Sequence, residues 1–189
     1  MNVYDFDNTI FRGDSTTRFF FWCLRRFPGA RQDWPGQLAN AILFVLRLKP
    51  KQAFKQRMFQ FLRAVPDVER ALDAFWAENY LRVKAWYPQK HRPDDVVISA
   101  SPDWLIAPAC RKLGISAIMG SPVRMDTGLY YGPNCHGAEK VRRFRAAFPQ
   151  GEIDEFFSDS HSDDPLAALA KRAWLVKGER LLPWDESRA

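Results

Sequence analysis

Hydrophobic and polar positions change their period along the chain. A short apolar run, Val3-Tyr4, ends at an acidic residue. From Ser15 to about Tyr87, apolar residues then recur at intervals of three and four, the period of helices with one buried face. Proline and glycine interrupt this pattern at Pro28-Gly29, Pro35-Gly36, Pro50 and Pro66. The pattern predicts a bundle of about four helices.

From Asp94 onward, short apolar runs alternate with helical patterns. Strands are predicted at 96–98, 116–119, 155–157 and 174–176, and helices at 104–113, 138–148 and 166–172. The turn sequence Asp126-Thr127-Gly128 predicts a hairpin between residues 123–125 and 129–131. Alternating β and α units favour an α/β fold with a Rossmann-like parallel sheet and helices on both faces. Ligands bind such sheets beyond the carboxyl ends of the strands.

Composition and charge add a second distinction between the helical segment and the rest. The chain has 189 residues and 47% hydrophobic content, enough for one sizeable core and a small additional domain. Residues 11–95 hold 16 Lys/Arg and 8 Asp/Glu, whereas the remainder holds 12 and 14. A basic insert suggests contact with something anionic, and the alternative is an ordinary solvated helix surface. No nucleic-acid recognition motif is present, so we expect no nucleic-acid partner.

The cysteines and the apolar runs bear on the compartment. Cys23, Cys110 and Cys135 are odd in number and widely spaced, which favours reduced thiols over a disulfide framework. The first predicted strand is followed at once by Asp5 and Asp7, which does not fit a secretory signal. The longest apolar stretch, residues 41–46, is shorter than the roughly 20 residues of a membrane-spanning helix. These features predict a cytoplasmic protein that contacts a membrane peripherally at most.

Residues able to carry chemistry follow the predicted strands. Asp5, Asp7 and Thr9 come directly after the first strand, and Ser99 ends the strand at 96–98. Lys140 lies in the first turn of a predicted helix. Asp159 and Asp163 follow the strand at 155–157. Because parallel strands end at one edge of a sheet, these side chains are expected to meet there.

With these motifs in this order, the chain resembles the haloacid dehalogenase superfamily. The resemblance rests on Asp-x-Asp-x-Thr at 5–9, the strand-terminal Ser99, Lys140, and Asp-x-x-x-Asp at 159–163. The helical insertion after the first motif resembles the phosphoserine-phosphatase-like branch, subfamily IB, in which a cap is inserted there. The resemblance implies a catalytic core formed by residues 1–12 and 93–189, and a helical cap domain formed by residues 13–92.

The resemblance also implies a role for each site residue. Asp5 would be the nucleophile that forms an aspartyl-phosphate, and Asp7 would transfer protons to the leaving group and from water. Lys140 and Ser99 would bind the phosphoryl oxygens, with backbone N–H groups near Asn8 and Ser101 as further donors. Mg²⁺ would be held by Asp5, the backbone carbonyl of Asp7, Asp159 and, directly or through water, Asp163. Relatives commonly have Gly at position 8, but Asn tolerates unusual backbone angles.

The implied function is a Mg²⁺-dependent phosphomonoester hydrolase. Its substrate would be a small phosphorylated metabolite such as phosphoserine. Asp7 argues against a dehalogenase, because halide leaves without a proton. The alternatives are a phosphatidylglycerophosphate-type lipid phosphatase, a phosphotransferase, and a catalytically idle protein that binds a phospho-ligand. The oligomeric state is not predicted.

Residues 37–49 leave two interpretations open, because they are apolar on more than one face. This segment could be the central helix of the bundle, buried all round. Alternatively, its exposed apolar side, together with Lys51, Lys55 and Arg57, could lie on an anionic membrane surface and admit a lipid phosphate.

For a few other residues, the sequence allows more than one role or argues against one. Asp14 and Arg18 could contact the leaving group, although Asp14 or Ser15 could instead cap a helix. Asp164, directly before Pro165, is predicted to be a helix N-cap. Cys135, His136 and His161 do not have the spacing of a soft-metal site.

Overall fold

The computed structural model describes residues 1–32, 34–48 and 51–185. In this part of the chain, a six-stranded sheet has the order β3-β2-β1-β4-β5-β6. The central strand β1 (Asn2–Tyr4) lies between β2 (Val96–Pro102) and β4 (Ile153–Ser158), and β3 (Ala117–Ser121) is one edge. These strands and β5 (Ala170–Lys177) are parallel, whereas β6 (Arg180–Pro183) pairs with β5 in the antiparallel sense. The predicted parallel α/β sheet is confirmed.

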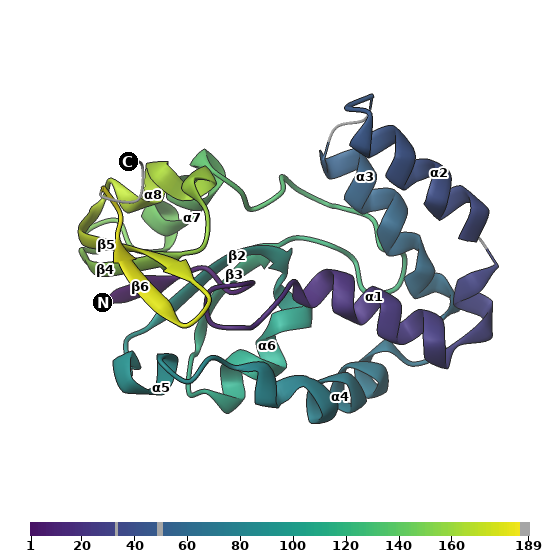
Figure 1. The fold of residues 1–189 in the computed structure, drawn as a ribbon, viewed down its shortest axis with the longest axis horizontal. Helices are drawn as coiled ribbons and strands as arrows, with labels where there is room; N and C mark the ends of the chain where they lie inside the picture. Colours follow the sequence, from purple (N-terminus) through teal and green to yellow (C-terminus); the bar gives the residue numbers. More distant parts are fainter. Residues whose placement is uncertain (33, 49–50, 186–189) are drawn as a thin grey trace.

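Alternate residues of the strands face two separate hydrophobic clusters. Tyr4, Val97 and Phe157 pack in the cluster that includes residues of α5 (Tyr87–Lys90) and α6 (Asp103–Lys112). Their neighbours along the strands pack in the cluster that includes residues of α7 (Ala138–Ala147) and α8 (Asp164–Ala167). Figure 1 shows the two pairs of helices on opposite faces of the sheet. The sheet is therefore covered on both sides, as parallel sheets generally are.

The segment between β1 and β2 is helical, as predicted. Besides the short α5, its described part contains four longer α-helices: α1 (Ser15–Arg26), α2 (Trp34–Val45), α3 (Lys51–Met58) and α4 (Val68–Asn79). These helices lie at the opposite end of the molecule from β5 and β6 (Figure 1). Aromatic side chains from α1, α4 and the 3₁₀ turn Phe59–Ala64 pack between them, including Phe19, Phe61 and Phe75. Lys49 and Pro50, at one predicted break, lie outside the described residues.

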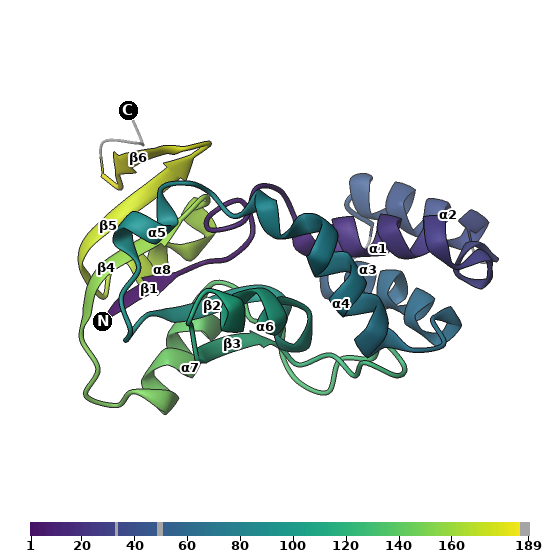
Figure 2. The ribbon, with the colours of Figure 1, turned by 90° about the horizontal axis from the view of Figure 1, so that it is seen from below.

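The outgoing and returning chain pass side by side between the sheet and these helices. Phe11 and Val83 form an antiparallel bridge. The Arg12 N–H donates to the Arg82 carbonyl at 2.9 Å, and the Lys84 N–H donates to the Ile10 carbonyl at 2.8 Å. Figure 2 shows the same connection from below. The boundaries of the cap at 13 and 92 stay a prediction, and α5, inside that range, packs with Tyr4 of the sheet.

The C-terminal part differs from the prediction in two places. The helix predicted at 166–172 is wrong, because α8 ends at Ala167 and β5 begins at Ala170. Ala170 pairs with Ile153 and Arg172 pairs with Glu155, so the ladder with β4 determines the conformation of this segment. The strand β6, which follows a turn at Gly178, was not predicted. The hairpin at 123–131 is present as one bridge between Val123 and Tyr130.

The interpretation of residues 37–49 as a helix buried all round is also wrong. In α2, Gln37 and Asn40 are buried, whereas Leu38, Ile42 and Val45 are exposed. Among the described residues, no helix has both the length and the apolar character needed to cross a membrane. Cys23, Cys110 and Cys135 are free and buried, in agreement with the predicted reduced thiols.

Candidate active site

The loop that follows β1 carries the first two candidate residues. The Asp5 N–H donates to the Phe157 carbonyl of β4 at 2.9 Å, which holds Asp5 between the ends of the two strands. Beyond it the chain turns tightly, because the Phe6 carbonyl accepts the N–H groups of Ile10 and Phe11. Within this turn Asn8 has φ 56°, a left-handed conformation that Asn adopts more readily than most residues.

Lys140 joins two of the predicted carboxylates. Its Nζ donates to Asp5 Oδ1 at 2.8 Å and to Asp163 Oδ2 at 2.7 Å. Lys140 is 2% exposed, although it begins on the first turn of α7. A buried ammonium group with two carboxylate partners is compensated, whereas either carboxylate alone would be costly to bury. The structure thus brings together residues from β1, α7 and the turn after β4.

The charges of this group depend on one another. Burial of the charged ammonium group lowers the pKa of Lys140. The negative charges and hydrogen bonds of Asp5 and Asp163 raise it by more, so the Lys140 pKa lies above its usual value. Burial raises the pKa of Asp5 to about 7; Lys140 acts in the opposite direction, and Asp163 adds to the rise. The hydrogen bond from Lys140 is to Oδ1 of Asp5, and Asp5 as a whole is 8% exposed.

Asp7 has a different environment, at the N-terminus of α1. Its Oδ1 accepts the Ser15 N–H at 2.7 Å, and its Oδ2 accepts a hydrogen bond from Ser101 Oγ. The Ser101 hydroxyl also lies 2.8 Å from Thr16 Oγ1. Burial raises the pKa of Asp7 to about 6, Asp14 adds to the rise, and the hydrogen bonds from Ser101 and Ser15 oppose it. Asp7 can therefore exchange a proton close to neutral pH.

The predicted phosphate-binding residues lie in the same region, but two of their amide groups already have partners. Ser99 is 1% exposed and lies inside β2, which continues to Pro102, so the prediction that Ser99 ends this strand is wrong. Its Oγ accepts the Ser101 N–H at 3.2 Å. The Asn8 N–H donates to the Gly13 carbonyl at 3.1 Å. A phosphate would have to replace these internal acceptors to use either N–H. The Ser99 hydroxyl and the Lys140 ammonium group are side-chain donors in this region, whereas the Ser101 hydroxyl already donates to Asp7.

The two downstream acids, Asp163 and Asp159, differ in burial and in their contacts. Asp163 is 2% exposed; its Oδ2 accepts hydrogen bonds from Lys140 and from Ser158 Oγ at 2.8 Å. Its Oδ1 is buried and has no hydrogen-bond partner within the described part of the chain. Asp159 is partly buried, and burial raises its pKa.

These oxygens fit the implied Mg²⁺. Among the described residues, no three His, Cys, Asp or Glu side chains are grouped closely enough to hold a metal by themselves. Mg²⁺ does not need such a group, because it commonly takes one or two carboxylates and completes its octahedron with water and substrate phosphate. The all-oxygen donor set and the unpartnered Asp163 oxygen are consistent with this metal. Asp5 and Asp159, with Asp163 beside them, are the residues that would hold it.

Sequence reasoning missed two lysines that reach this region. Lys84 is 3% exposed, and its Nζ donates to the Asn8 carbonyl. The Nζ of Lys55, on α3, donates to the Ala100 carbonyl at 3.2 Å, between Ser99 and Ser101. Lys84 lies between Arg82 and Lys90 in the sequence, so no local signal distinguishes it from basic surface residues. Nothing in the sequence around Lys55 distinguishes it from the other basic residues of the insert.

Three minor predictions can also be compared with the structure. Asp14 is the N-cap of α1 and accepts the Thr17 N–H at 2.7 Å. Asp164 is the first residue of α8 rather than its N-cap, and its carboxylate accepts the Trp184 indole N–H at 2.9 Å. Among the described residues, Cys135, His136 and His161 belong to no group of three side chains able to hold a metal.

Comparison with known proteins identifies the family. The model of the haloacid dehalogenase-like hydrolases matches residues 3–168, so the chain belongs to this family. It is 28% identical to protein CicA of Caulobacter vibrioides, over 89% of this chain and 82% of CicA.

Two solved structures share the fold. The first is a Bordetella pertussis Tohama I protein with unknown function (TM-score 0.75, 17% identity, 92% of this chain and 87% of that one). The second is a phosphoserine phosphohydrolase-like protein from Francisella tularensis (TM-score 0.59, 16% identity, 92% and 86%). The predicted resemblance to the superfamily is confirmed, and at the level of fold it extends to the phosphoserine-phosphatase-like branch.

Proposed function

We propose that this protein is a Mg²⁺-dependent phosphatase that hydrolyses phosphomonoesters through an aspartyl-phosphate on Asp5. The observation that carries the proposal is the buried Lys140 joined to Asp5 at 2.8 Å, with Asp7 hydrogen-bonded separately to Ser15 and Ser101. Two carboxylates two positions apart thus occupy different environments. Such a division commonly separates a nucleophile from a proton donor.

In the first step, a carboxylate oxygen of Asp5 attacks phosphorus and the bond from phosphorus to the leaving oxygen breaks. Asp7 gives its proton to the departing alkoxide, which leaves as an alcohol. Lys140 and the Ser99 hydroxyl bind the phosphoryl oxygens and offset their negative charge. Mg²⁺, when bound, supplies further positive charge and reduces the repulsion between the phosphate dianion and Asp5.

In the second step, water attacks phosphorus in the aspartyl-phosphate. Asp7 accepts a proton from that water, and the acyl-phosphate bond breaks. Inorganic phosphate is released and the Asp5 carboxylate is regenerated. Asp7 ends the cycle protonated, ready for the next leaving group. The pKa of about 6 that burial gives Asp7 is suited to a group that both donates and accepts a proton.

The test is phosphate release with and without Mg²⁺ by the wild type and by Asp5→Asn. The panel contains phosphoserine and small sugar and polyol phosphates. We expect release that needs Mg²⁺ and is lost in Asp5→Asn, while the exposed Asp73→Asn, the same chemical change on α4, behaves as wild type. Mg²⁺-dependent release that persists in Asp5→Asn would overturn the assignment of the nucleophile. No release from any compound would overturn the hydrolase and leave transfer to another acceptor, or ligand binding alone.

A further inference from the structure

Helix α2 lies at the surface but buries polar side chains and exposes apolar ones, the reverse of the usual arrangement. Its amide side chains face the protein: Gln37 Nε2 donates to the Arg57 carbonyl and Asn40 Nδ2 to the Phe54 carbonyl, both at 3.0 Å. Its apolar side chains face outward, with Leu38 53%, Ile42 51% and Val45 77% exposed. Soluble helices ordinarily bury such residues and expose the polar ones. An outer face of this kind needs an apolar environment.

The exposed apolar side chains are close in sequence and continue beyond the end of α2. Positions 38, 42 and 45 are separated by four and three residues, so they share one side of the helix. Leu46 and Leu48, 60% and 71% exposed, extend the apolar surface. A contiguous patch of this kind marks an interaction site more often than isolated exposed leucines do.

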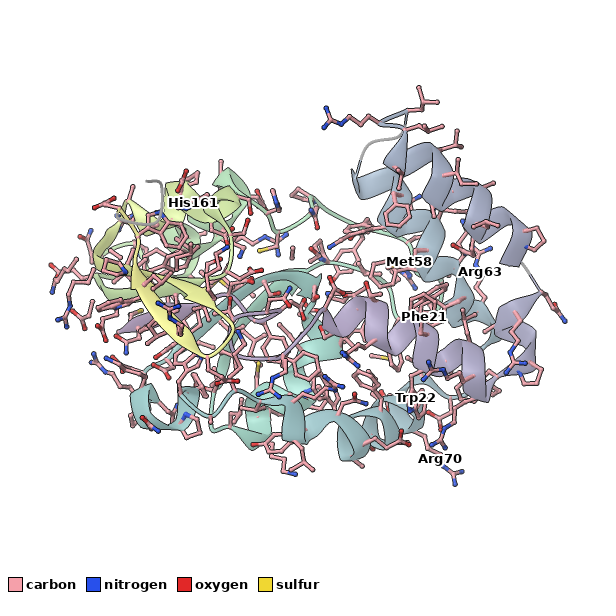
Figure 3. All side chains as sticks on the ribbon, viewed as in Figure 1. Phe21, Trp22, Met58, Arg63, Arg70 and His161 are labelled. Atoms are coloured by element: carbon pink, nitrogen blue, oxygen red, sulfur yellow. The ribbon has the colours of Figure 1, made fainter. Side chains whose placement is uncertain are left out.

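The charge of the sequence segment that contains α2 indicates the kind of partner. Between Ser15 and Pro66 the sequence has ten Lys/Arg and one acidic residue, Asp33. Arg47 follows α2 and is exposed, and Arg63 is exposed in the turn after α3 (Figure 3). A partner that offers both an apolar interior and a negatively charged surface fits both observations. An anionic lipid bilayer has these properties.

A cleft lies between α1 and the pair α2–α3. It has a volume of about 370 Å³, within the range of small-molecule sites. Its wall is mainly apolar and includes Phe20 and Phe21 of α1, Leu38 and Ala41 of α2, and Met58 of α3. Figure 3 shows Phe21 and Met58 between the helices. Leu38 and Phe21 are also partly exposed, so the cleft is continuous with the outer apolar surface.

The other end of the cleft reaches the candidate active site. Thr16 lines the cleft, and its hydroxyl is 2.8 Å from Ser101 Oγ, which donates to Asp7. Lys55 also lines the cleft and donates to the Ala100 carbonyl between Ser99 and Ser101. A leaving group protonated by Asp7 would therefore extend into an apolar space.

From this arrangement, and building on the proposed phosphatase activity, we propose that the substrate is a membrane-resident phosphomonoester with a long apolar leaving group. The exposed face of α2 rests on an anionic bilayer, and the apolar chain of the substrate enters the cleft between α1 and α2–α3. The phosphate is then beside Asp5 and Lys140, at the polar end of the cleft. Hydrolysis releases the apolar alcohol into the bilayer and phosphate into water.

The first arm of the test measures kcat/KM for soluble monoalkyl phosphates of increasing chain length. Each methylene that enters an apolar site contributes roughly fourfold, so the wild type should favour longer chains until the cleft is full. Ala41→Phe places a ring in the cleft and should lower the ratio of long-chain to short-chain kcat/KM at least tenfold. A ratio that is independent of chain length in the wild type would overturn the substrate class.

The second arm measures co-sedimentation with vesicles of phosphatidylcholine, with and without phosphatidylglycerol. We expect binding only to the anionic vesicles, and its loss in the double variant Ile42→Glu/Val45→Glu. The matched control is Leu81→Glu, because Leu81 is 94% exposed but lies outside α2. Phosphatidic acid in the same vesicles should be hydrolysed by the wild type and the control, and at least tenfold more slowly by the double variant.

The outcomes separate this inference from the proposed function. Mg²⁺-dependent release from small esters without chain-length preference or vesicle binding would overturn the inference and leave the phosphatase intact. Absence of release from every ester would overturn both. A wild-type dimer that Ile42→Glu/Val45→Glu converts to a monomer would show that this face binds a second copy, and would also overturn the inference.

Discussion

Lys84 donates a hydrogen bond from its buried Nζ to the backbone carbonyl of Asn8. Asn8 lies in the loop that carries Asp5 and Asp7, whereas Lys84 lies on the segment that returns from the helices to the sheet. That segment pairs with the outgoing one through Phe11 and Val83. Burial lowers the Lys84 pKa, with Glu179 and Asp159 acting in the opposite direction. The connection between the helices and the sheet is thus attached directly to the candidate catalytic loop.

Replacing Lys84 should therefore affect turnover as well as stability. Lys84→Met keeps the length of the side chain but removes the hydrogen bond to the loop, and we expect kcat to fall about tenfold, because small displacements of reacting groups are costly. Turnover well below the melting temperature separates this effect from unfolding. Lys112→Met, an exposed lysine on α6, is the control. An unchanged kcat with a lowered melting temperature would assign Lys84 a structural role alone.

Removing Lys140 should destabilise the fold because it leaves Asp5 and Asp163 buried without their shared cation. We expect Lys140→Met to lower the free energy of unfolding by about 3–5 kcal/mol, measured by urea denaturation. The additional change Asp163→Asn should recover part of this loss, since it removes one uncompensated carboxylate. Lys177→Met, the same change at an exposed site on β5, serves for comparison. Simple additivity of the Lys140 and Asp163 effects would contradict the observed ion pair.

The proton-donor role of Asp7 predicts a dependence on the leaving group. Asp7→Asn should lower kcat/KM for an alkyl phosphate by about 10²–10⁴-fold, because an alkoxide leaves poorly without a proton. The loss should be much smaller for nitrophenyl phosphate, whose leaving group is stable as an anion. Asp5→Asn should abolish turnover of both esters. Equal losses on both esters in Asp7→Asn would argue against the proton-donor role.

Two glycines with similar backbone angles should respond differently to alanine. Gly128 has φ 70°, and a Cβ there would overlap the Phe59 carbonyl of the helical insert. Gly178 has φ 62° with open space around it. Gly178→Ala should cost about 1–2 kcal/mol from backbone strain alone. Gly128→Ala should cost about 1–3 kcal/mol more. Denaturant titration of both variants measures the difference, and equal costs would show that the contact with Phe59 is not tight.

Glu139 should contribute stability at neutral pH that disappears in acid. Hydrogen bonds from Arg142, together with those from Arg143, lower the Glu139 pKa from 4.5 to about 2. A depressed carboxyl pKa stabilises the fold above the unfolded value, and this contribution is lost as the pH falls from 4.5 towards 2. Glu139→Gln should therefore lower the melting temperature by a few degrees at pH 7. The difference from wild type should shrink below pH 4.5, and a difference that is constant with pH would contradict the ion pair.

Much of the candidate site could be predicted because its residues follow the carboxyl ends of parallel strands. Asp5, Ser99 and Asp163 are separated by many residues in the sequence, yet β1, β2 and β4 are neighbours in the sheet. Two further residues that contact this region, Lys84 and Lys55, could not be predicted in the same way. Nothing local distinguishes Lys84 or Lys55 from the exposed lysines, because their contacts with Asn8 and Ala100 exist only after the helices pack on the sheet.

The sequence by itself determined most of the alternation of strands and helices, the helical insertion, and the order of residues in the candidate active site. Periodicity and motif spacing are local properties, so they can be recognised before the chain folds. Only the tertiary structure decided that residues 170–172 pair with β4 instead of extending α8, and that the apolar side of α2 faces outward. Both outcomes depend on which surfaces remain available after distant segments have packed. The local sequence pattern of an apolar residue is the same whether that residue packs in the protein core or against a surface outside the protein.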